Sequence, residues 1–230
     1  MYRATSGNYR KRGERSKGRK RETTIHTLIN NGFSMEQNVQ NWSRTTNNIF
    51  IAVLIFSIGS IAAGILSLLG SFSFVRVLVW IVEIGVIAGY VLYILRLGDL
   101  RTMVEEKERA AIGQIRTAAI LTIVTAVLGL FSLSGWIAGI INFAAFVIML
   151  VGFNTLKKST TMPEKARSGF NQLFIAMLLN IIAVGLMTIL SWIPLVGIVM
   201  ATIAGILGII GFIMVIPGWA AVKNSPAPIA

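Results

Sequence analysis

Three polar side chains lie within long apolar segments of the chain, where each is a candidate for chemistry or for specific packing. Glu83 is the one acidic residue in these segments, and Asn142 and Asn180 are amides. A carboxylate held in an apolar medium is costly, so by default it indicates a proton or cation site. The alternative for Glu83 is a protonated or hydrogen-bonded residue that fixes helix packing. Amides at such depth commonly hydrogen-bond between helices, so packing is the favoured role for Asn142 and Asn180.

Other kinds of site chemistry lack the residues they need. The chain has no Cys and one His, His26, in its polar N-terminal part. This composition excludes Cys-ligated metals and any His-based metal site or catalytic triad in the apolar segments. The nearest approach to a serine-protease motif, Ser132–Gly135, lacks a leading Gly and a His base. We therefore expect no enzyme activity, no metal and no cofactor.

The apolar segments themselves define the class of protein. Of 230 residues, 55% are hydrophobic and 13% charged, and uncharged runs of 27, 40 and 55 residues cover 49–75, 117–156 and 168–222. About 20 apolar residues cross a bilayer as a helix. The runs exclude a soluble enzyme and a disordered chain. They predict an all-α, polytopic membrane helical bundle with six transmembrane helices, at about 49–70, 76–96, 116–132, 136–156, 170–190 and 196–217.

The Lys and Arg residues predict how these helices are oriented. Ten lie in the N-terminal region, five at 96–116, four at 157–167 and one, Lys223, after the last helix. The alternate turns, near 71–75, 132–135 and 191–195, hold none. Loops rich in Lys and Arg stay in the cytoplasm. We therefore expect both termini to be cytoplasmic (N-in/C-in).

The chain also repeats itself, as three tandem helical hairpins at about 49–101, 108–158 and 164–224. Glu108-Arg109-Ala110-x-x-Gly113 recurs 56 residues later as Glu164-Lys165-Ala166-x-x-Gly169. Each copy begins and ends on the same side of the bilayer. The copies are therefore expected to be related by an axis along the membrane normal.

The second helices of the second and third hairpins match at a different offset. Gly152 and Lys157 match Gly218 and Lys223 at an offset of 66, as Phe146 matches Phe212. The first copy is fainter and aligns at an offset of 56, with Trp80 on Trp136 and Leu100 on Leu156. Trp residues at helix ends suit the membrane interface, so anchoring is the favoured role for them.

The second hairpin follows a pattern in which a Gly enters the first helix, an apolar turn follows, and the second helix ends in a Gly-x-x-x-Leu-Lys exit. In this chain the corresponding residues are Gly113, Trp136 and Gly152–Lys157. The pattern resembles a loose group of uncharacterised bacterial multi-pass membrane proteins built from repeated helical hairpins. The resemblance covers about 49–223. It implies the architecture and a bacterial inner membrane, and no activity.

A basic, largely disordered tail is expected at 1–48, before the six-helix domain at 49–223, with a short C-terminal tail at 225–230. Residues 1–34 carry a net charge of +7 of the total of +12. The expected partner is anionic lipid, attracted by about 1 kcal/mol per basic residue near the surface, or RNA, whose binding weakens with salt. The third interpretation is a topology signal alone. The predicted anion-binding residues are Arg10, Lys11, Arg12, Arg15, Lys17, Arg19, Lys20 and Arg21.

The tail has a further interpretation, in which it is not translated. Met35 stands where the composition changes abruptly, shortly before the first apolar segment. A chain that begins at Met35 has a net charge of +5, an ordinary surplus for cytoplasmic loops.

Three functions are open at this point. The leading expectation is a structural or interaction role, through helix packing with lipids, a second copy or another membrane protein. Small residues four apart, such as Gly85 and Gly89, favour such close packing. The alternative is a small transporter or channel with Glu83 as the proton or cation coupling site. The third is recruitment of RNA, the ribosome or anionic lipid by the tail.

Overall fold

The computed structural model describes residues 36–63, 65–66, 73–130, 135–190 and 194–228. The chain divides into two compact units, Met1–Asn41 and Trp42–Ala230. Of the first unit only 36–41 are described, as the start of a helix. The predicted anion-binding residues of the tail, the start at Met35 and most of the three uncharged turns lie outside the described residues.

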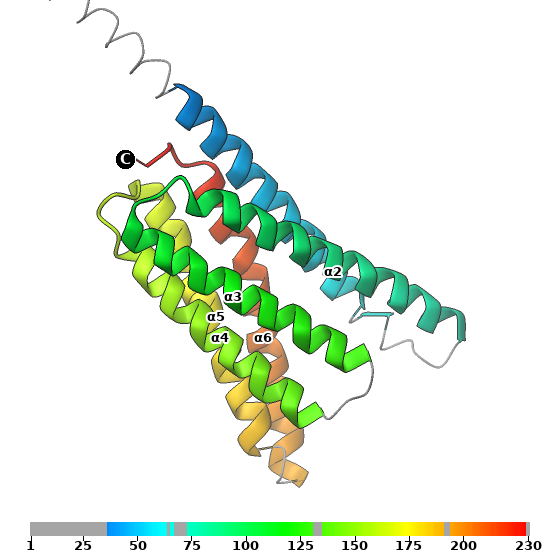
Figure 1. The fold of residues 1–230 in the computed structure, drawn as a ribbon. Helices are drawn as coiled ribbons and strands as arrows, with labels where there is room; N and C mark the ends of the chain where they lie inside the picture. Colours follow the sequence, from blue (N-terminus) through cyan, green and yellow to red (C-terminus); the bar gives the residue numbers. More distant parts are fainter. Residues whose placement is uncertain (1–35, 64, 67–72, 131–134, 191–193, 229–230) are drawn as a thin grey trace, which may run out of the picture. The chain divides into compact units, whose positions relative to one another are not determined.

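Six helices make up nearly all of the described residues, and each is long and apolar enough to cross a membrane. This confirms the prediction of six membrane-length helices without strands for the described part of the chain. A first helix, Glu36–Ala63, is followed by α2 (Ser73–Arg101), α3 (Glu106–Leu130), α4 (Gly135–Lys157), α5 (Glu164–Leu190) and α6 (Pro194–Lys223) (Figure 1).

The first helix begins within the segment 1–48 that the sequence analysis assigns to a disordered tail. Residues 36–48 contain neither Pro nor Gly, and Trp42, Thr45 and Thr46 are buried. Trp42 Nε1 donates a hydrogen bond of 3.3 Å to the carbonyl of Ser225, beyond the end of α6. Thr46 Oγ1 donates to the carbonyl of Trp42 at 2.8 Å. Burial against the C-terminal end of the chain therefore orders a polar segment as helix.

Five helices extend beyond their apolar segments into charged residues, at one end of the bundle. Negative charge at a helix N-terminus and positive charge at a C-terminus both oppose the helix dipole, so these charges stabilise the added turns. The first turns of α3 and α5 carry Glu106, Glu108 and Glu164, and the last turns of α2, α4 and α6 carry Arg101, Lys157 and Lys223. We call this end the basic end and the opposite one the uncharged end.

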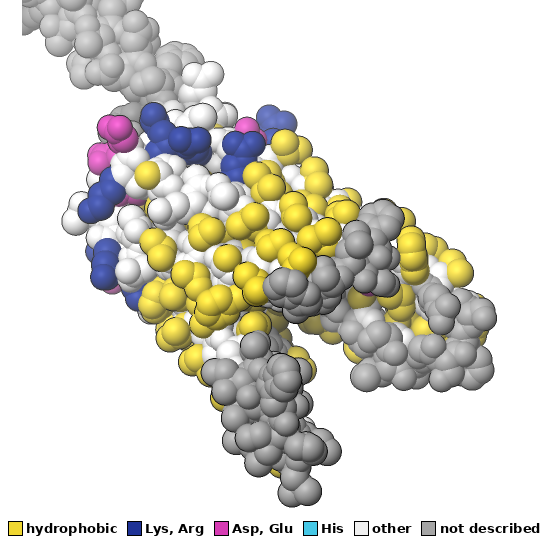
Figure 2. Space-filling view, turned by 60° about the horizontal axis from the view of Figure 1, so that its bottom comes forward, with side chains coloured by type: hydrophobic (Ala, Val, Ile, Leu, Met, Phe, Trp, Pro, Cys, Tyr) yellow, Lys and Arg dark blue, Asp and Glu magenta, His cyan; other side chains and the backbone are white. Residues whose placement is uncertain are grey.

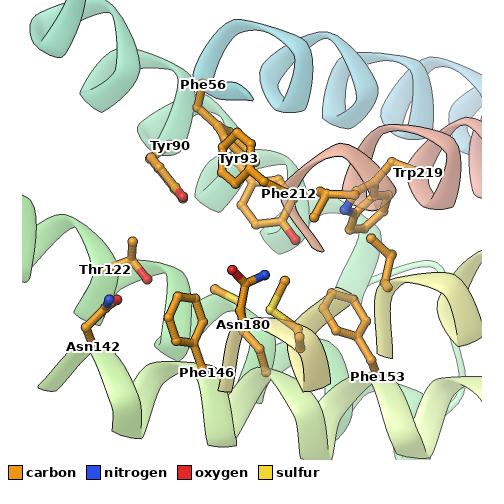
Figure 3. Close-up of a pocket in the computed structure, with 14 residues that line it drawn as sticks. Phe56, Tyr90, Tyr93, Thr122, Asn142, Phe146, Phe153, Asn180, Phe212 and Trp219 are labelled. Carbon is orange, nitrogen blue, oxygen red and sulfur yellow. The ribbon is translucent and has the colours of Figure 1, made fainter. Parts of the chain in front are cut away.

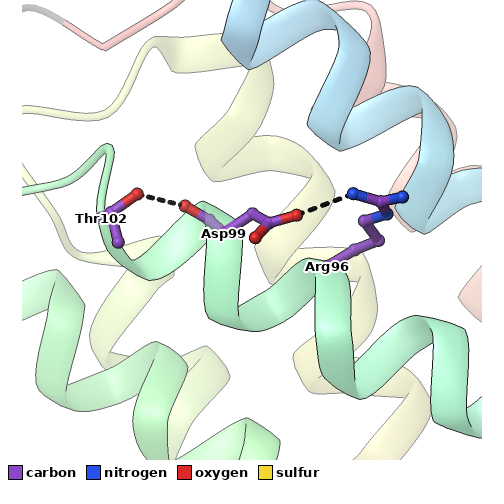
Figure 4. Close-up of polar contacts among 3 residues, drawn as sticks. All are labelled: Arg96, Asp99 and Thr102. Atoms are coloured by element: carbon purple, nitrogen blue, oxygen red, sulfur yellow. Dashed lines mark hydrogen bonds and ion pairs between the residues drawn. The ribbon is translucent and has the colours of Figure 1, made fainter.

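One ion pair lies at the basic end, near the last turn of α2. Arg96 Nη1 donates to Asp99 Oδ2 at 2.9 Å, and Thr102 Oγ1 donates to the carbonyl of Asp99 at 2.7 Å (Figure 4). Both members of the ion pair are about half exposed, so the pair contributes little to stability. These contacts hold the last turns of α2 in place, and we do not assign a functional site to them.

In the second unit each helix from α2 to α6 packs on the next one along the chain, and the first helix contacts both α2 and α6. α2 packs on α3, α3 on α4, α4 on α5 and α5 on α6. The first helix contacts α2 at Gly89, where an added methyl group would lie 3.0 Å from the backbone nitrogen of Phe56. The same helix contacts α6, since the rings of Phe56 and Phe212 are 6.5 Å apart. The six helices therefore surround a common interior.

Burial within this arrangement is concentrated toward the basic end. The buried hydrophobic residues of α3 all lie between Ala111 and Ala119, and those of α4 between Ala145 and Leu156. Toward the uncharged end, large apolar side chains are open, with Ile84 63% and Ile140 61% exposed. Lys and Arg side chains gather at one end of the visible surface, and apolar side chains cover much of the rest (Figure 2). The apolar surface suits lipid contact.

Candidate functional site

A cavity of about 220 Å³ lies between the helices of the second unit (Figure 3). All six helices contribute to its lining. Its walls are largely aromatic, and four of the rings come from the first helix, α2, α4 and α6. These are Phe56, Tyr90, Phe146 and Phe212. The rings of Phe56 and Tyr90 are stacked, with centroids 4.3 Å apart.

An aromatic cluster closes the cavity on the side of the basic end. Trp219 is its centre and contacts the rings of Tyr93, Phe153 and Phe170 edge-on, with centroids 5.6, 6.5 and 6.2 Å away. Tyr93, Phe153 and Trp219 line the cavity, while Phe170 lies behind them and is fully buried. We call Tyr93, Phe153, Phe170 and Trp219 the aromatic floor.

Five side chains with hydroxyl or amide groups line the cavity from four different helices: Tyr90, Tyr93, Thr122, Asn142 and Asn180 (Figure 3). Two of them are held by their own helices. Thr122 Oγ1 donates to the carbonyl of Ala118 at 3.1 Å, and Asn180 Nδ2 donates to the carbonyl of Ala176 at 2.9 Å. Each keeps an oxygen lone pair for another partner. The lining therefore offers hydroxyl and amide groups, and none of its described residues carries a formal charge.

The three polar candidates of the sequence analysis differ in their position relative to the cavity. Asn142 and Asn180 lie on α4 and α5, far apart in sequence, and both line the cavity. Glu83 is partly buried on α2 and is not among the lining residues. It lies two helical turns from Tyr90, toward the uncharged end. A site that joins all three residues is therefore not formed around this cavity.

Sequence analysis missed the aromatic lining, although a signal for it was present. Phe146 and Phe153 are seven residues apart on α4, as are Phe212 and Trp219 on α6. A spacing of seven keeps side chains on one face of a helix. Such a pattern in an apolar helix does not by itself distinguish an inward face from a lipid-exposed one.

A second polar cluster, also missed, lies at the basic end. The Glu108 side chain on α3 is 3% exposed, and its Oε1 accepts hydrogen bonds from Ser159 Oγ at 2.6 Å and Thr161 Oγ1 at 3.1 Å. Ser159 Oγ in turn accepts from the backbone N–H groups of Thr161 and Met162, both at 3.2 Å. The cluster ties the start of α3 to the segment that joins α4 to α5.

At this position Glu108 is a hydrogen-bond acceptor that anchors the start of α3. Its Oε2 is buried and has no partner among the described residues. The described residues contain no group of three or more His, Cys, Asp or Glu side chains placed to hold a metal ion. The repeat of Glu108 as Glu164 singled out the residue in the sequence, but it could not indicate which copy is buried, and Glu164 is exposed.

Comparison with known proteins found no match: no family model, no curated protein and no solved structure matches this chain. The geometry of the cavity is therefore the basis for a functional proposal.

Proposed function

We propose that the chain is a multi-pass membrane protein that binds a small, largely apolar molecule in the cavity between its six helices. The observation that carries this proposal is the cavity itself, of about 220 Å³ and lined by every helix. A cavity of about 150 Å³ in a protein core is large enough to bind benzene. The ligand is therefore expected to be somewhat larger than benzene, with polar atoms for the hydroxyl and amide groups of the lining.

The proposed role is binding without catalysis. The side chains that reach the cavity are aromatic, aliphatic, hydroxyl and amide groups, and none is a nucleophile activated by a neighbouring base. Hydroxyl and amide groups in a mostly apolar pocket orient a ligand and select it.

We propose further that the bundle consists of three hairpins around the cavity, with both termini in the cytoplasm. Support for the repeat comes from Tyr90, Phe146 and Phe212, which correspond at the offsets of 56 and 66 and all line the cavity. Support for the orientation comes from the Lys and Arg residues of the basic end. The bacterial inner membrane as location rests on the resemblance described above.

A second candidate function is helix packing with lipids, a second copy or another membrane protein. Gly85 on α2 and Gly185 on α5 favour it, because an added methyl group at either would meet no described residue within 4 Å. Glycines on a helix surface let another helix approach closely. Proton or cation coupling by Glu83 is less favoured, since Glu83 does not line the cavity. Recruitment of RNA or anionic lipid by the tail stays a prediction for residues outside the described ones.

Filling the cavity tests the proposal. Thr122→Phe on α3 places a ring in the cavity, whereas Val124→Phe is the matched control, since Val124 is 42% exposed on the same helix. The probe is indole, a neutral aromatic molecule with one hydrogen-bond donor, titrated into protein in lipid nanodiscs and followed by saturation-transfer NMR. We expect Thr122→Phe to abolish protein-dependent indole binding and Val124→Phe to retain it. Equal binding by both variants contradicts a role for the cavity.

A further inference from the structure

The cavity is lined by an unusual number of aromatic rings for its size. Seven of its lining residues are Phe, Tyr or Trp, and they come from four helices. A sphere of the same volume has a radius of roughly 4 Å, so a group at its centre lies within cation–π distance of several rings at once. Aromatic faces attract a cation through the negative potential above the ring, most strongly where water is excluded.

No positive side chain of the described residues competes for these rings from inside the cavity. The nearest Lys residues toward the basic end are already placed against other rings. Lys157 Nζ lies 3.3 Å from the ring centroid of Phe174, and Lys223 Nζ lies 4.8 Å from that of Phe50. Neither Phe174 nor Phe50 lines the cavity, and the aromatic floor closes the cavity on this side. Among the described residues, no positive side chain therefore occupies the lining rings.

On α4 and α6, the face that lines the cavity carries a glycine further toward the uncharged end. Gly139 lies three residues before Asn142, and Gly208 four residues before Phe212, spacings that stay on one helical face. A methyl group added at either glycine would meet no described residue within 4 Å. Among the described residues, the lack of side chains there leaves room for a ligand to reach the cavity from the uncharged end.

One carboxylate, Glu83, lies on α2 toward the uncharged end, on the helix face that carries Tyr90. Glu83 lies seven residues before Tyr90 on α2, a spacing that keeps one helical face and spans roughly 10 Å along the axis. It is partly buried, so its charge is screened less than on an open surface. A negative charge near the approach to an aromatic pocket favours cationic ligands over neutral ones of the same shape.

We infer that the cavity binds a small organic cation, an ammonium group carried on an apolar body, which reaches the aromatic walls from the uncharged end past Glu83. This inference rests on the proposed function, because it names the class of ligand for the same cavity. The rings supply the attraction for the charged group, and the apolar walls hold the body of the ligand. The hydroxyl and amide oxygens contribute further acceptors.

A matched pair of probes separates charge from shape. Benzyltrimethylammonium and neopentylbenzene differ by replacement of the positive nitrogen with carbon. Both are titrated calorimetrically into the full chain in lipid nanodiscs, with protein-free nanodiscs as the reference for partition into lipid. We expect the cation to bind at least about tenfold more tightly than the neutral probe, as several cation–π contacts predict.

Two variants test the groups assigned to the cation. Phe212→Leu keeps an apolar wall and removes one ring, so we expect cation affinity to fall about threefold to tenfold while neutral affinity stays within about twofold. Phe143→Leu is the control, because Phe143 is 42% exposed on α4 and outside the lining. Glu83→Gln is expected to lower cation affinity severalfold and to leave neutral affinity unchanged. Phe146→Leu repeats the test if Phe212→Leu does not yield folded protein.

The outcomes distinguish this inference from the proposed function. Equal affinity for the two probes, or an equal loss for both in Phe212→Leu, overturns the cation assignment and leaves a neutral ligand for the same cavity. Failure of the wild-type protein to bind either probe, together with the failure of the indole experiment, overturns the proposed function as well.

Discussion

The two ends of the helix bundle both contain glycines within their helices, but these glycines pack in different ways. At the basic end, an added methyl group at Gly169 would lie 2.5 Å from the carbonyl oxygen of Gly218, and one at Gly152 would lie 3.0 Å from that of Ala111. Toward the uncharged end, methyl groups added at Gly139, Gly185 and Gly205 would meet no described residue within 4 Å. Gly152 and Gly169 therefore bring helices into contact, whereas these three glycines leave space among the described residues.

The difference shows what holds helices together in lipid. Apolar side chains gain little by leaving lipid for protein, so association depends on close fit and on polar contacts. The basic end has both, in its glycine contacts and in the Glu108 cluster, while the cavity lies between this end and the looser one. Three pairs of variants test this difference between the two ends.

The largest effect is expected from the aromatic floor. Phe170→Ala removes a fully buried ring that lies within 6.5 Å of both Phe153 and Trp219, and we expect a loss of about 3 kcal/mol in the free energy of unfolding. The value lies at the lower end for such changes because lipid solvates the exposed chain in the unfolded state. SDS titration of the protein in mixed micelles measures it.

Phe143→Ala is the counterpart on the exposed surface of α4, where the ring is 42% exposed. We expect it to cost less than about 1 kcal/mol. Equal losses in the two variants would show that burial at the floor adds no stability beyond that of contact with lipid.

An intermediate effect is expected at the Glu108 cluster. Glu108→Ala leaves the hydroxyls of Ser159 and Thr161 without their acceptor, and we expect a loss of about 1.5–3 kcal/mol, as for hydrogen bonds to a charged group. Glu164→Ala is the matched change at the corresponding, exposed residue, and it is expected to cost less than about 1 kcal/mol through the helix dipole alone. The same SDS titration measures both variants. A larger loss for Glu164→Ala than for Glu108→Ala would show that Glu164, and not Glu108, is the anchoring residue.

The smallest destabilisation is expected at one glycine of α5, and a second glycine of the same helix is its counterpart. Gly169→Ala forces α6 to shift away from α5, at an expected cost of about 1–3 kcal/mol. Gly185→Ala meets open space, so the protein is expected to be unchanged or up to about 1 kcal/mol more stable, because Ala is the better helix former. Thermal unfolding followed by circular dichroism ranks the two. If Gly169→Ala is as stable as wild type, the close approach of the two helices is not needed.

Some elements of the structure could be predicted from the sequence because they depend on local composition. An uncharged apolar run such as 168–222 must form membrane-length helices, since backbone groups in hydrocarbon have no other partners. Asn142 and Asn180 can also be identified from the sequence, because each is an amide among apolar residues. The helical state of 36–48 could not be predicted in this way, because it depends on the burial of Trp42 near Ser225.

The class of the protein and its six helices follow from composition and from the order of apolar and charged residues, as does the concentration of Lys and Arg at alternate loops. Which helix faces meet is set by tertiary packing, and so is the fact that Phe146 and Phe212 line one cavity, that Glu83 does not line it and that Glu108 is buried while Glu164 is exposed. The cause is that a membrane helix is apolar on every side. No amphipathic pattern then separates the inward face from the one that contacts lipid.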